Sequence, residues 1–561
     1  MTQPPPEQSP QHPQSPVPPQ GGFGPPPQDG FGPPQQGQTP GFGPPPQGQA
    51  PGFGPPPQGQ APGFGPPVAP PPSGFGPHQA YHPIPAPVPP PGAGGRRPGR
   101  RTAIVVSVVT AIALIVGGGV WYATSADGGS KDETAAKPGG DSAAPKYEKP
   151  KETAPKDPKA FFTTKAIQPK LPKGETTWKA QGSWLTDKVY AKASVEAIVG
   201  VDATSGKGLW RLPKPGESCA GSPDLGKGNI AVVVTGAKVH DERGFKDACT
   251  EVTAFEVDTG KKLWTKSITI GYQKKKTEFN QVTISGDTVA VGGLYGGAAF
   301  DLRTGDVRWE PKQGEKCRDV GYGGGERLLA VRSCGDYGSE RFQVQLLDPA
   351  TGKSKWTHKL PAGVRSPSVV STKPVVLALD SGEISSSGAT DVFSLDEKGD
   401  RRTRIALPDG KYLHECGTVS VVQDCRGIAA GNGKLYVPTK QRDGAKEFSS
   451  TNDIVVFSLT TGKTTGEKVE AGDSSPIFPI RMDGGNVLVY KSGPYAQVVS
   501  LDGRDLKKET VLLDAGTRPT ALPPLISELR FHRNKLFLSS DLLGQYSSDK
   551  KTIMMFGFAA K

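Results

Sequence analysis

The stretch Ala299-Phe300-Asp301-Leu302-Arg303-Thr304-Gly305-Asp306-Val307-Arg308-Trp309 decides the fold, because its frame recurs along the chain. The frame is an acidic residue, then Thr-Gly, then a Trp four residues after the Gly. Residues 254–264 and 346–356 repeat it, and residues 201–210 repeat it with Ser in place of Thr. Each copy predicts a strand, a tight turn whose Gly adopts a positive φ, and a second strand that opens toward the Trp.

A single hairpin of this kind cannot bury both of its faces, so units that recur at intervals of roughly 40 to 60 residues must stack on one another. Three further units keep the strand and the turn Gly but lack the Trp. Paired strands can be traced in eight units between residues 188 and 558. The sequence therefore predicts an all-β fold, an eight-bladed β-propeller, with seven blades as the alternative.

In these residues the chain resembles the pyrroloquinoline-quinone-like, tryptophan-docking β-propeller repeat family, which contains quinoprotein dehydrogenases and cofactor-free binding propellers. The resemblance implies that each Trp lies between adjacent blades and donates its indole N–H to the backbone of the neighbouring blade. That role is expected for Trp210, Trp264, Trp309 and Trp356. The turn glycines of the repeat are Gly206, Gly260, Gly305, Gly352, Gly399, Gly462 and Gly503.

The eighth unit ends the chain before any Trp-bearing strand, which would leave an unpaired edge. We expect residues 176–179 to complete this blade, with Trp178 as the missing Trp. The alternative is that Trp178 is a partly exposed aromatic residue of a linker. The longest interval between turns, from Gly399 to Gly462, predicts a projecting loop that contains Cys416, Cys425 and residues 441–453.

Residues 1–101 differ from the repeat region in composition. Of the 561 residues 74 are Gly and 58 are Pro, and residues 1–101 hold much of this excess together with Gln and evenly spaced Phe. Such a segment buries too little apolar surface to fold, so we predict a disordered cytoplasmic tail. It serves either as a spacer or as a set of weak docking points for partners.

A membrane anchor is predicted next. Residues 102–124 form an uncharged run rich in Val, Ile and Ala, long enough to cross a bilayer as one helix. The Arg residues before it and the acidic residues after it place the tail in the cytoplasm and the later chain outside. Residues 125–159 predict a charged, extended stalk, and residues 160–561 predict the propeller.

Six cysteines lie on the side predicted to be extracytoplasmic, which indicates disulfides. Pairing of sequence neighbours is favoured, because a propeller keeps such residues close, although six cysteines allow fifteen arrangements. The favoured pairs are Cys219 with Cys249, Cys317 with Cys334, and Cys416 with Cys425.

Several functions are disfavoured. The net charge of +12 comes from scattered Lys residues and no nucleic-acid motif accompanies it. The resemblance implies, for the dehydrogenases, a disulfide between adjacent cysteines and a calcium ion near the quinone, and the chain has no Cys-Cys pair. No catalytic or metal-binding spacing is found, so no cofactor is expected.

The sequence thus favours a non-catalytic, extracytoplasmic binding or scaffolding propeller, anchored to the cell membrane, for a protein, peptide or glycan of the cell envelope. One alternative is a ligand sensor whose cytoplasmic tail recruits a partner. The least favoured alternative is a quinone-dependent dehydrogenase.

Overall fold

The computed structural model describes residues 147–561, except 243, 272–274, 337, 382–388, 418–420, 494–495, 517–521 and 545–551. The predicted tail, the predicted membrane helix and the stalk up to residue 146 lie outside the described residues. All elements found in the described part of the chain are strands, and it contains no helix long and apolar enough to cross a membrane.

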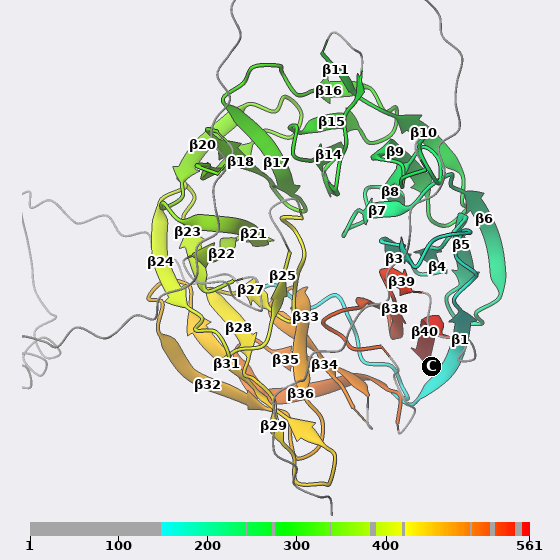
Figure 1. Ribbon diagram of the computed structural model, residues 1–561. Helices are drawn as coiled ribbons and strands as arrows, with labels where there is room; N and C mark the ends of the chain where they lie inside the picture. Colours follow the sequence, from blue (N-terminus) through cyan, green and yellow to red (C-terminus); the bar gives the residue numbers. More distant parts are fainter. Residues whose placement is uncertain are drawn as a thin grey trace, which may run out of the picture. The chain divides into compact units, whose positions relative to one another are not determined.

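Eight four-stranded antiparallel sheets are arranged in a ring (Figure 1). The all-β, eight-bladed prediction is therefore confirmed, and the seven-bladed alternative is wrong. Blades 1 to 4 are β3 (Ser183–Leu185), β4 (Val189–Ala193), β5 (Ala197–Asp202) and β6 (Gly208–Pro213); β7 (Ser218–Gly221), β8 (Ile230–Gly236), β9 (Cys249–Glu256) and β10 (Lys262–Lys266); β13 (Gln281–Ser285), β14 (Thr288–Gly292), β15 (Ala298–Asp301) and β16 (Val307–Trp309); and β17 (Cys317–Gly323), β18 (Leu328–Cys334), β19 (Arg341–Leu347) and β20 (Ser354–Lys359).

Blades 5 to 8 follow in the same order around the ring, except that the outer strand of blade 8 comes from the start of the described chain. They are β21 (Val364–Thr372), β22 (Val375–Ser381), β23 (Asp391–Leu395) and β24 (Arg401–Ala406); β27 (Ala429–Gly431), β28 (Lys434–Pro438), β31 (Asp453–Ser458) and β32 (Thr464–Glu470); β33 (Ile477–Asp483), β34 (Asn486–Lys491), β35 (Gln497–Asp502) and β36 (Asp505–Asp514); and β37 (Glu528–His532), β38 (Lys535–Ser539), β40 (Ile553–Ala560) and β1 (Ala160–Ile167).

Four two-stranded sheets lie outside the eight blades. They are β2 (Thr177–Lys179) with β39 (Leu542–Gly544), β11 (Thr269–Ile270) with β12 (Lys275–Lys276), β25 (Glu415–Cys416) with β26 (Cys425–Arg426), and β29 (Arg442–Asp443) with β30 (Ser450–Thr451).

The burial of the strands explains their composition. The second strand of a blade is covered on both faces by the neighbouring blades, so β8 is buried at every residue and reads as a continuous apolar run. The outermost strands β6 and β20 alternate between more and less exposed residues, because only one of their faces meets the next blade. The core is accordingly a series of apolar layers between blades.

The blade register agrees with the pairs traced in the sequence. Strand β4 pairs with β5, with Ala191 opposite Gly200, and β14 pairs with β15, with Ala290 opposite Ala299. These central pairs carry the strongest alternating or continuous apolar patterns, which is why they can be found in the sequence. The shorter inner strands line the axis of the ring, where the candidate site lies.

Candidate functional site

The repeat frame forms the contact between blades. Trp210, Trp264, Trp309 and Trp356 each lie on the outer strand of one blade and contact the turn Gly of the next. A Cβ atom added to Gly260, Gly305, Gly352 or Gly399 would lie 2.5, 2.7, 2.9 and 2.6 Å from the nearest atom of the preceding Trp. These glycines have φ between 69° and 87°. The positions therefore require Gly both for the turn and for the aromatic ring that covers it.

The acidic residue of the frame holds the turn. One carboxylate oxygen of Asp301 accepts hydrogen bonds from the backbone N–H groups of Arg303 and Thr304, at 2.9 and 3.0 Å. The Thr304 N–H bond, together with the Arg308 guanidinium, lowers the pKa of Asp301 to about 2 even though partial burial opposes it. In the Asp-x-x-Thr-Gly sequence the Asp side chain thus accepts hydrogen bonds from the backbone of its own turn.

Two of the four indole N–H groups of the repeat donate a hydrogen bond, and two do not. Trp264 Nε1 donates to the carbonyl oxygen of Leu302 in the next blade at 2.9 Å, and Trp309 Nε1 donates to the Tyr322 hydroxyl at 3.2 Å. Within the described structure, the buried Nε1 atoms of Trp210 and Trp356 have no hydrogen-bond partner. Trp184, which the repeat frame did not reveal, donates to the Ser222 carbonyl oxygen at 2.9 Å from an inner strand.

Ring closure differs from the expectation. Strand β1 pairs with β40 as the outer strand of blade 8, whereas Trp178 lies in β2 and pairs with β39 outside the blade. The prediction that residues 176–179 close the ring is therefore wrong. The longer, more apolar β1 forms seven residue pairs with β40, whereas β2 forms three with β39. Trp178 is nevertheless 1% exposed, so the alternative of an exposed linker aromatic is also wrong.

Trp178 has a different role in the fold. It belongs to an apolar cluster of blades 1 and 8, and the ammonium groups of Lys214 and Lys246 lie 5.5 and 5.8 Å from its ring centroid. In blade 8 the place over Gly206 is taken by Thr163 and Thr164 of β1.

The other Trp-less junctions differ from one another. Thr403 takes the place of a Trp over Gly462. Gly503 contacts Gly485 of its own blade and does not have the positive φ of the other turn glycines.

The six cysteines form three disulfides, so the expected disulfides are confirmed. Cys219 is joined to Cys249, Cys317 to Cys334, and Cys416 to Cys425. The first two lie within blades 2 and 4, and the third joins β25 to β26.

The loop closed by the third disulfide turns inward and forms a plug, defined here as residues 421–426. The Val422 side chain is fully buried, and the Val422 carbonyl oxygen accepts a hydrogen bond from Val369 N of blade 5 at 2.6 Å. The Gln423 side-chain oxygen accepts hydrogen bonds from Thr283 Oγ1 and Gly324 N at 2.6 and 2.9 Å. The prediction of a projecting loop is thus wrong for this segment. It holds for the hairpin β29–β30, which extends beyond the ring in Figure 1.

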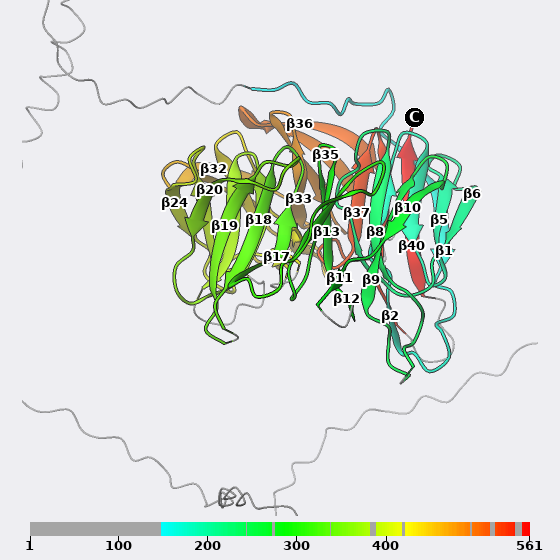
Figure 2. The same ribbon diagram turned by 90° about the horizontal axis from the view of Figure 1, so that it is seen from above.

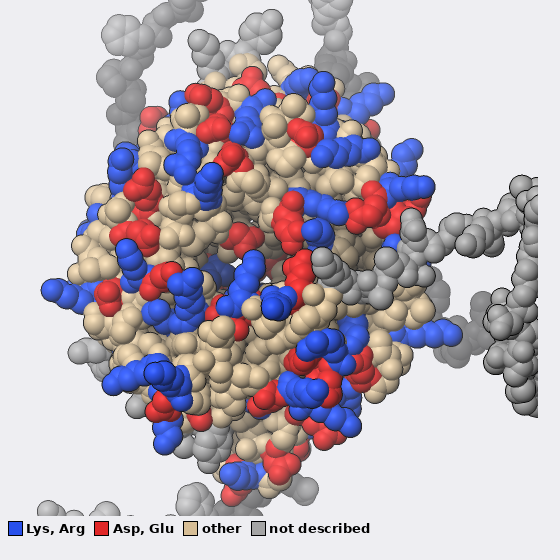
Figure 3. All heavy atoms as spheres, turned by 180° about the vertical axis from the view of Figure 1, so that it is seen from behind, with Lys and Arg blue, Asp and Glu red and all other residues tan. Residues whose placement is uncertain are grey.

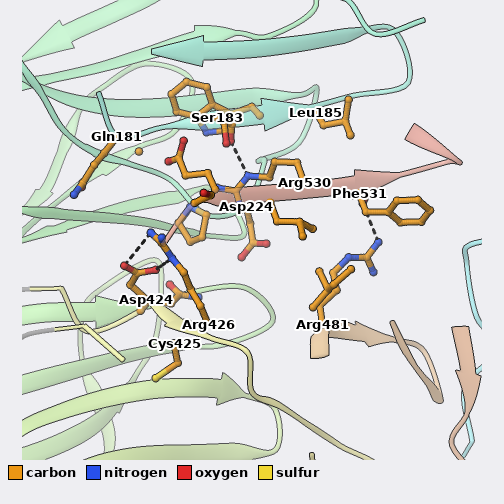
Figure 4. A pocket seen from close by; sticks show the side chains of 18 of the residues that line it. Gln181, Ser183, Leu185, Asp224, Asp424, Cys425, Arg426, Arg481, Arg530 and Phe531 are labelled. Carbon is orange, nitrogen blue, oxygen red and sulfur yellow. Dashed lines mark hydrogen bonds and ion pairs between the residues drawn. The ribbon is translucent and has the colours of Figure 1, made fainter. Parts of the chain in front are cut away.

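A cavity of about 750 Å³ remains in the channel beside the plug. Its wall is made by the inner strands of blades 1, 2, 3, 5, 7 and 8, by the segment after β7, and by the plug itself (Figure 4). Charged side chains from several blades converge on it, which the sequence did not reveal because each stands alone in its own inner strand.

Most of the channel charges are paired inside the protein. Lys192 Nζ lies 2.6 Å from a Glu528 carboxylate oxygen, and this buried pair joins blade 1 to blade 8. Burial alone would raise the pKa of Glu528, but the Lys192 ammonium holds it below its usual range. Arg426 of the plug bonds Asp424 at 2.9 Å and Asp541 at 2.8 Å.

A segment before the first strand contacts residues that line the same cavity. Residues 147–159, called here the strap, lie along one face of the ring (Figure 2). Glu152 of the strap is 6% exposed; its carboxylate accepts hydrogen bonds from Arg481 Nη2 at 2.7 Å and from Arg533 N at 2.8 Å. Glu152 N donates to Asp483 at 2.9 Å. The strap, which is the last part of the predicted charged, extended stalk, is therefore bonded to the propeller.

The face opposite that of Figure 1 shows Lys and Arg side chains interspersed with Asp and Glu around a central hollow (Figure 3). Positive and negative groups alternate there, in keeping with the scattered Lys residues of the sequence.

The family resemblance implies that a quinone would lie against a disulfide between adjacent cysteines and that carboxylate and amide side chains would hold a calcium ion. The cysteine nearest the cavity, Cys425, is bonded to Cys416 across two strands and not to an adjacent residue. Among the described residues, no group of three or more His, Cys, Asp or Glu side chains is placed to hold a metal ion. The residues present do not fit that cofactor pair.

Comparison with known proteins gives one family. The family model described as the outer membrane protein assembly factor BamB matches residues 165–321. No curated protein matches the chain.

Solved structures resemble the fold at low identity. BamB from Moraxella catarrhalis is 13% identical with a TM-score of 0.38, over 69% of this chain and 97% of that one. The quinohemoprotein alcohol dehydrogenase ADHIIG from Pseudomonas putida HK5 is 10% identical with a TM-score of 0.39, over 69% of this chain and 76% of that one. Residues 165–321, which match the assembly-factor family model, form part of a fold of eight blades.

Proposed function

We propose that the protein is a non-catalytic binding propeller of the cell envelope, anchored by a helix at residues 102–124 with its propeller outside the membrane. The observation that carries this proposal is the plugged channel. The axis is occupied by residues 421–426, and its charges are largely used in ion pairs between blades. Three disulfides support an oxidising, extracytoplasmic location.

The partner proposed is a protein, and the surface proposed for it is the projecting hairpin β29–β30. Phe448 at its tip is 99% exposed and has a φ of 57°, a backbone region that non-Gly residues seldom adopt. A large aromatic side chain held fully in solvent is typical of an interface anchor. The match of residues 165–321 to an assembly-factor model supports a protein partner.

Site-specific photo-crosslinking in cells tests this proposal. A photoreactive phenylalanine at position 448 should give a discrete adduct with an envelope protein. The same group at Val307, which is 49% exposed on the outer strand of blade 3, serves as the matched control and should give none. Adducts at neither position, or equal adducts at both, would refute the hairpin as the docking surface.

A second candidate, a ligand sensor, is favoured by the strap. Its Glu152 bonds Arg481 and Arg533, which also line the cavity, so a ligand in the channel would act on the segment that leads toward the predicted membrane helix. Deleting residues 1–101 separates the two functions. A binding propeller keeps its crosslinks without the tail, whereas a sensor keeps them but loses its cytoplasmic response.

A further inference from the structure

The turn between β33 and β34, residues 483–486, is shaped around the strap. A Cβ atom added to Gly484 or to Gly485 would have three atoms within 3.0 Å, and all three belong to the strap. At Gly485 these atoms are two carbons of the Tyr147 ring and a backbone oxygen. Gly485 has no positive φ, so the turn itself does not require Gly there. The missing side chain instead makes room for the strap.

The same turn recognises the backbone of the strap. Gly485 N donates to the Glu148 carbonyl oxygen at 2.6 Å. The Asp483 carboxylate, which is 2% exposed, accepts hydrogen bonds from Lys151 N at 3.1 Å and from Glu152 N at 2.9 Å. Within the described chain, every hydrogen bond that this carboxylate accepts comes from the strap. Because a buried carboxylate needs such donors, the turn is built to receive an extended peptide backbone.

Two side chains of the strap are recognised as well. The Tyr147 hydroxyl donates to Asn486 Oδ1 at 2.6 Å, and the Arg504 guanidinium lies 4.1 Å from the centre of the Tyr147 ring. Four residues further on than Glu148, the Glu152 carboxylate makes the bonds to Arg481 and to a backbone N–H that are described above. An aromatic ring and a carboxylate at a fixed spacing therefore give this surface sequence selectivity.

The strap is held without burying apolar side chains. Glu152 is the one residue among 147–159 that is buried, and the other strap residues are half-buried or exposed. Segments with few buried apolar contacts open at a lower free energy than the core. The ring is closed by β1, which begins only at Ala160 and pairs with β40. The strap can therefore leave the surface while the ring stays closed.

We propose that residues 481–486, Arg504 and Arg533, called here the receptor, form a peptide-binding site whose releasable occupant is the strap. The ligand is an extended peptide in which four residues separate an aromatic residue from a glutamate. This inference goes beyond the proposed docking function and does not depend on it. Since the strap is tethered beside the receptor at an effective concentration in the ~millimolar range, a separate peptide competes well only when the strap is weakened.

Fluorescence anisotropy with a labelled, end-blocked peptide of residues 147–159 and the full-length protein tests the proposal. Tyr147→Ala with Glu152→Ala weakens the strap and leaves the receptor intact, so this double variant should bind the peptide at least tenfold more tightly than the wild type. Adding Gly485→Ala should abolish binding, because the new Cβ takes the place of the Tyr ring. Adding Gly208→Ala is the matched control, since Gly208 also lacks a positive φ and has no atom within 4 Å of the added Cβ.

A peptide that carries Glu152→Gln should bind the double variant at least fivefold more weakly, because it lacks the charge that Arg481 meets. A thermal melt verifies the fold of the double variant, and Glu152→Gln in the full-length chain replaces it if the melt is altered. Three outcomes would overturn the proposal: no binding to the strap-weakened protein at millimolar peptide, equal loss of binding with Gly485→Ala and Gly208→Ala, and equal binding of the Glu152 and Gln peptides.

Discussion

The contact between Trp264 and Gly305 shows how single residues set the blade spacing. The ring of Trp264 lies over Gly305, and its indole N–H reaches Leu302 on the same turn. The Gly therefore meets two demands at once, a positive φ of 72° and a flat surface for the ring. The cost of the positive φ and the cost of the ring contact can be measured separately at a second Gly that has a positive φ but no aromatic ring over it.

Gly305→Ala should destabilise the propeller by roughly 2–4 kcal/mol, since the added Cβ meets both an unfavourable φ and the Trp264 ring at 2.7 Å. Gly314→Ala is the matched control, because Gly314 has a φ of 81° but no atom within 4 Å of the added Cβ. It should cost only about 1 kcal/mol. Urea unfolding monitored by tryptophan fluorescence measures both values, and equal costs would show that the ring contact contributes nothing.

At the scale of elements, the Cys416–Cys425 disulfide restrains the plug. Cys416 and Cys425 are nine residues apart, and cross-links that close loops of this size stabilise by roughly 2–3 kcal/mol. Replacing both with Ser should speed amide exchange in residues 421–428 by about one to two orders of magnitude. The blade strands should keep their protection. Replacing Cys317 and Cys334, which join adjacent strands of blade 4, should leave the plug unchanged, and hydrogen-exchange mass spectrometry distinguishes the two.

The strap gives a pH-dependent prediction. The Glu152 carboxylate, 3.6 Å from Nδ1, and the Asp187 carboxylate, 2.7 Å from Nε2, raise the pKa of His532 above 6.5 despite partial burial. Burial alone would raise the pKa of Glu152, but His532 and Arg481 lower it below 4.5. The His532 contribution is complete below pH 6.5 and is lost as the pH rises through the raised pKa. The Glu152 contribution is complete above pH 4.5 and is lost as the pH falls through the lowered pKa.

The strap should therefore be held most firmly between pH 4.5 and 6.5. Because the His532 side chain is 37% exposed, solvent screening keeps its effect below about 1 kcal/mol. Exchange of the strap amides, corrected for the intrinsic pH dependence, should rise up to roughly fivefold between pH 6 and pH 9. His532→Gln should abolish this rise, and an unchanged rise in that variant would assign it to another group.

Some elements could be predicted from the sequence and others could not. The central strand pairs were predictable because apolar periodicity and the Thr-Gly turn are local signals. The plug was not, since Val422 and Gln423 bond to blades 3, 4 and 5 and only tertiary structure decides whether a long loop folds inward. Lys192 and Glu528, which form an ion pair in the channel, are 336 residues apart in the chain, so no local spacing could pair them.

At the scale of the whole molecule, the ring is closed by joining its two ends, and three truncations test the closure. A chain that starts at residue 147 should unfold like the full-length protein. One that starts at residue 160 loses only the strap. One that starts at residue 168 lacks β1 and leaves β40 as an unpaired apolar edge, so it should self-associate and lose cooperative unfolding. Light scattering and thermal melts measure this, and a monomeric, cooperative third chain would contradict it.

The pairing of β1 with β40 also has a consequence for biosynthesis. Ala160 pairs with Ala560, so β1, the first strand of the propeller to be translated, cannot pair until β40, the last strand, has been synthesised. At ~5–20 residues per second the interval is about 20–80 s. Throughout it Phe161, Phe162 and the rest of β1 lack their native partner, although blades 1 to 7 can already assemble. A nascent chain stalled before β40 is synthesised is therefore an open ring with two unpaired strand edges, and quality-control factors can recognise these edges at this stage.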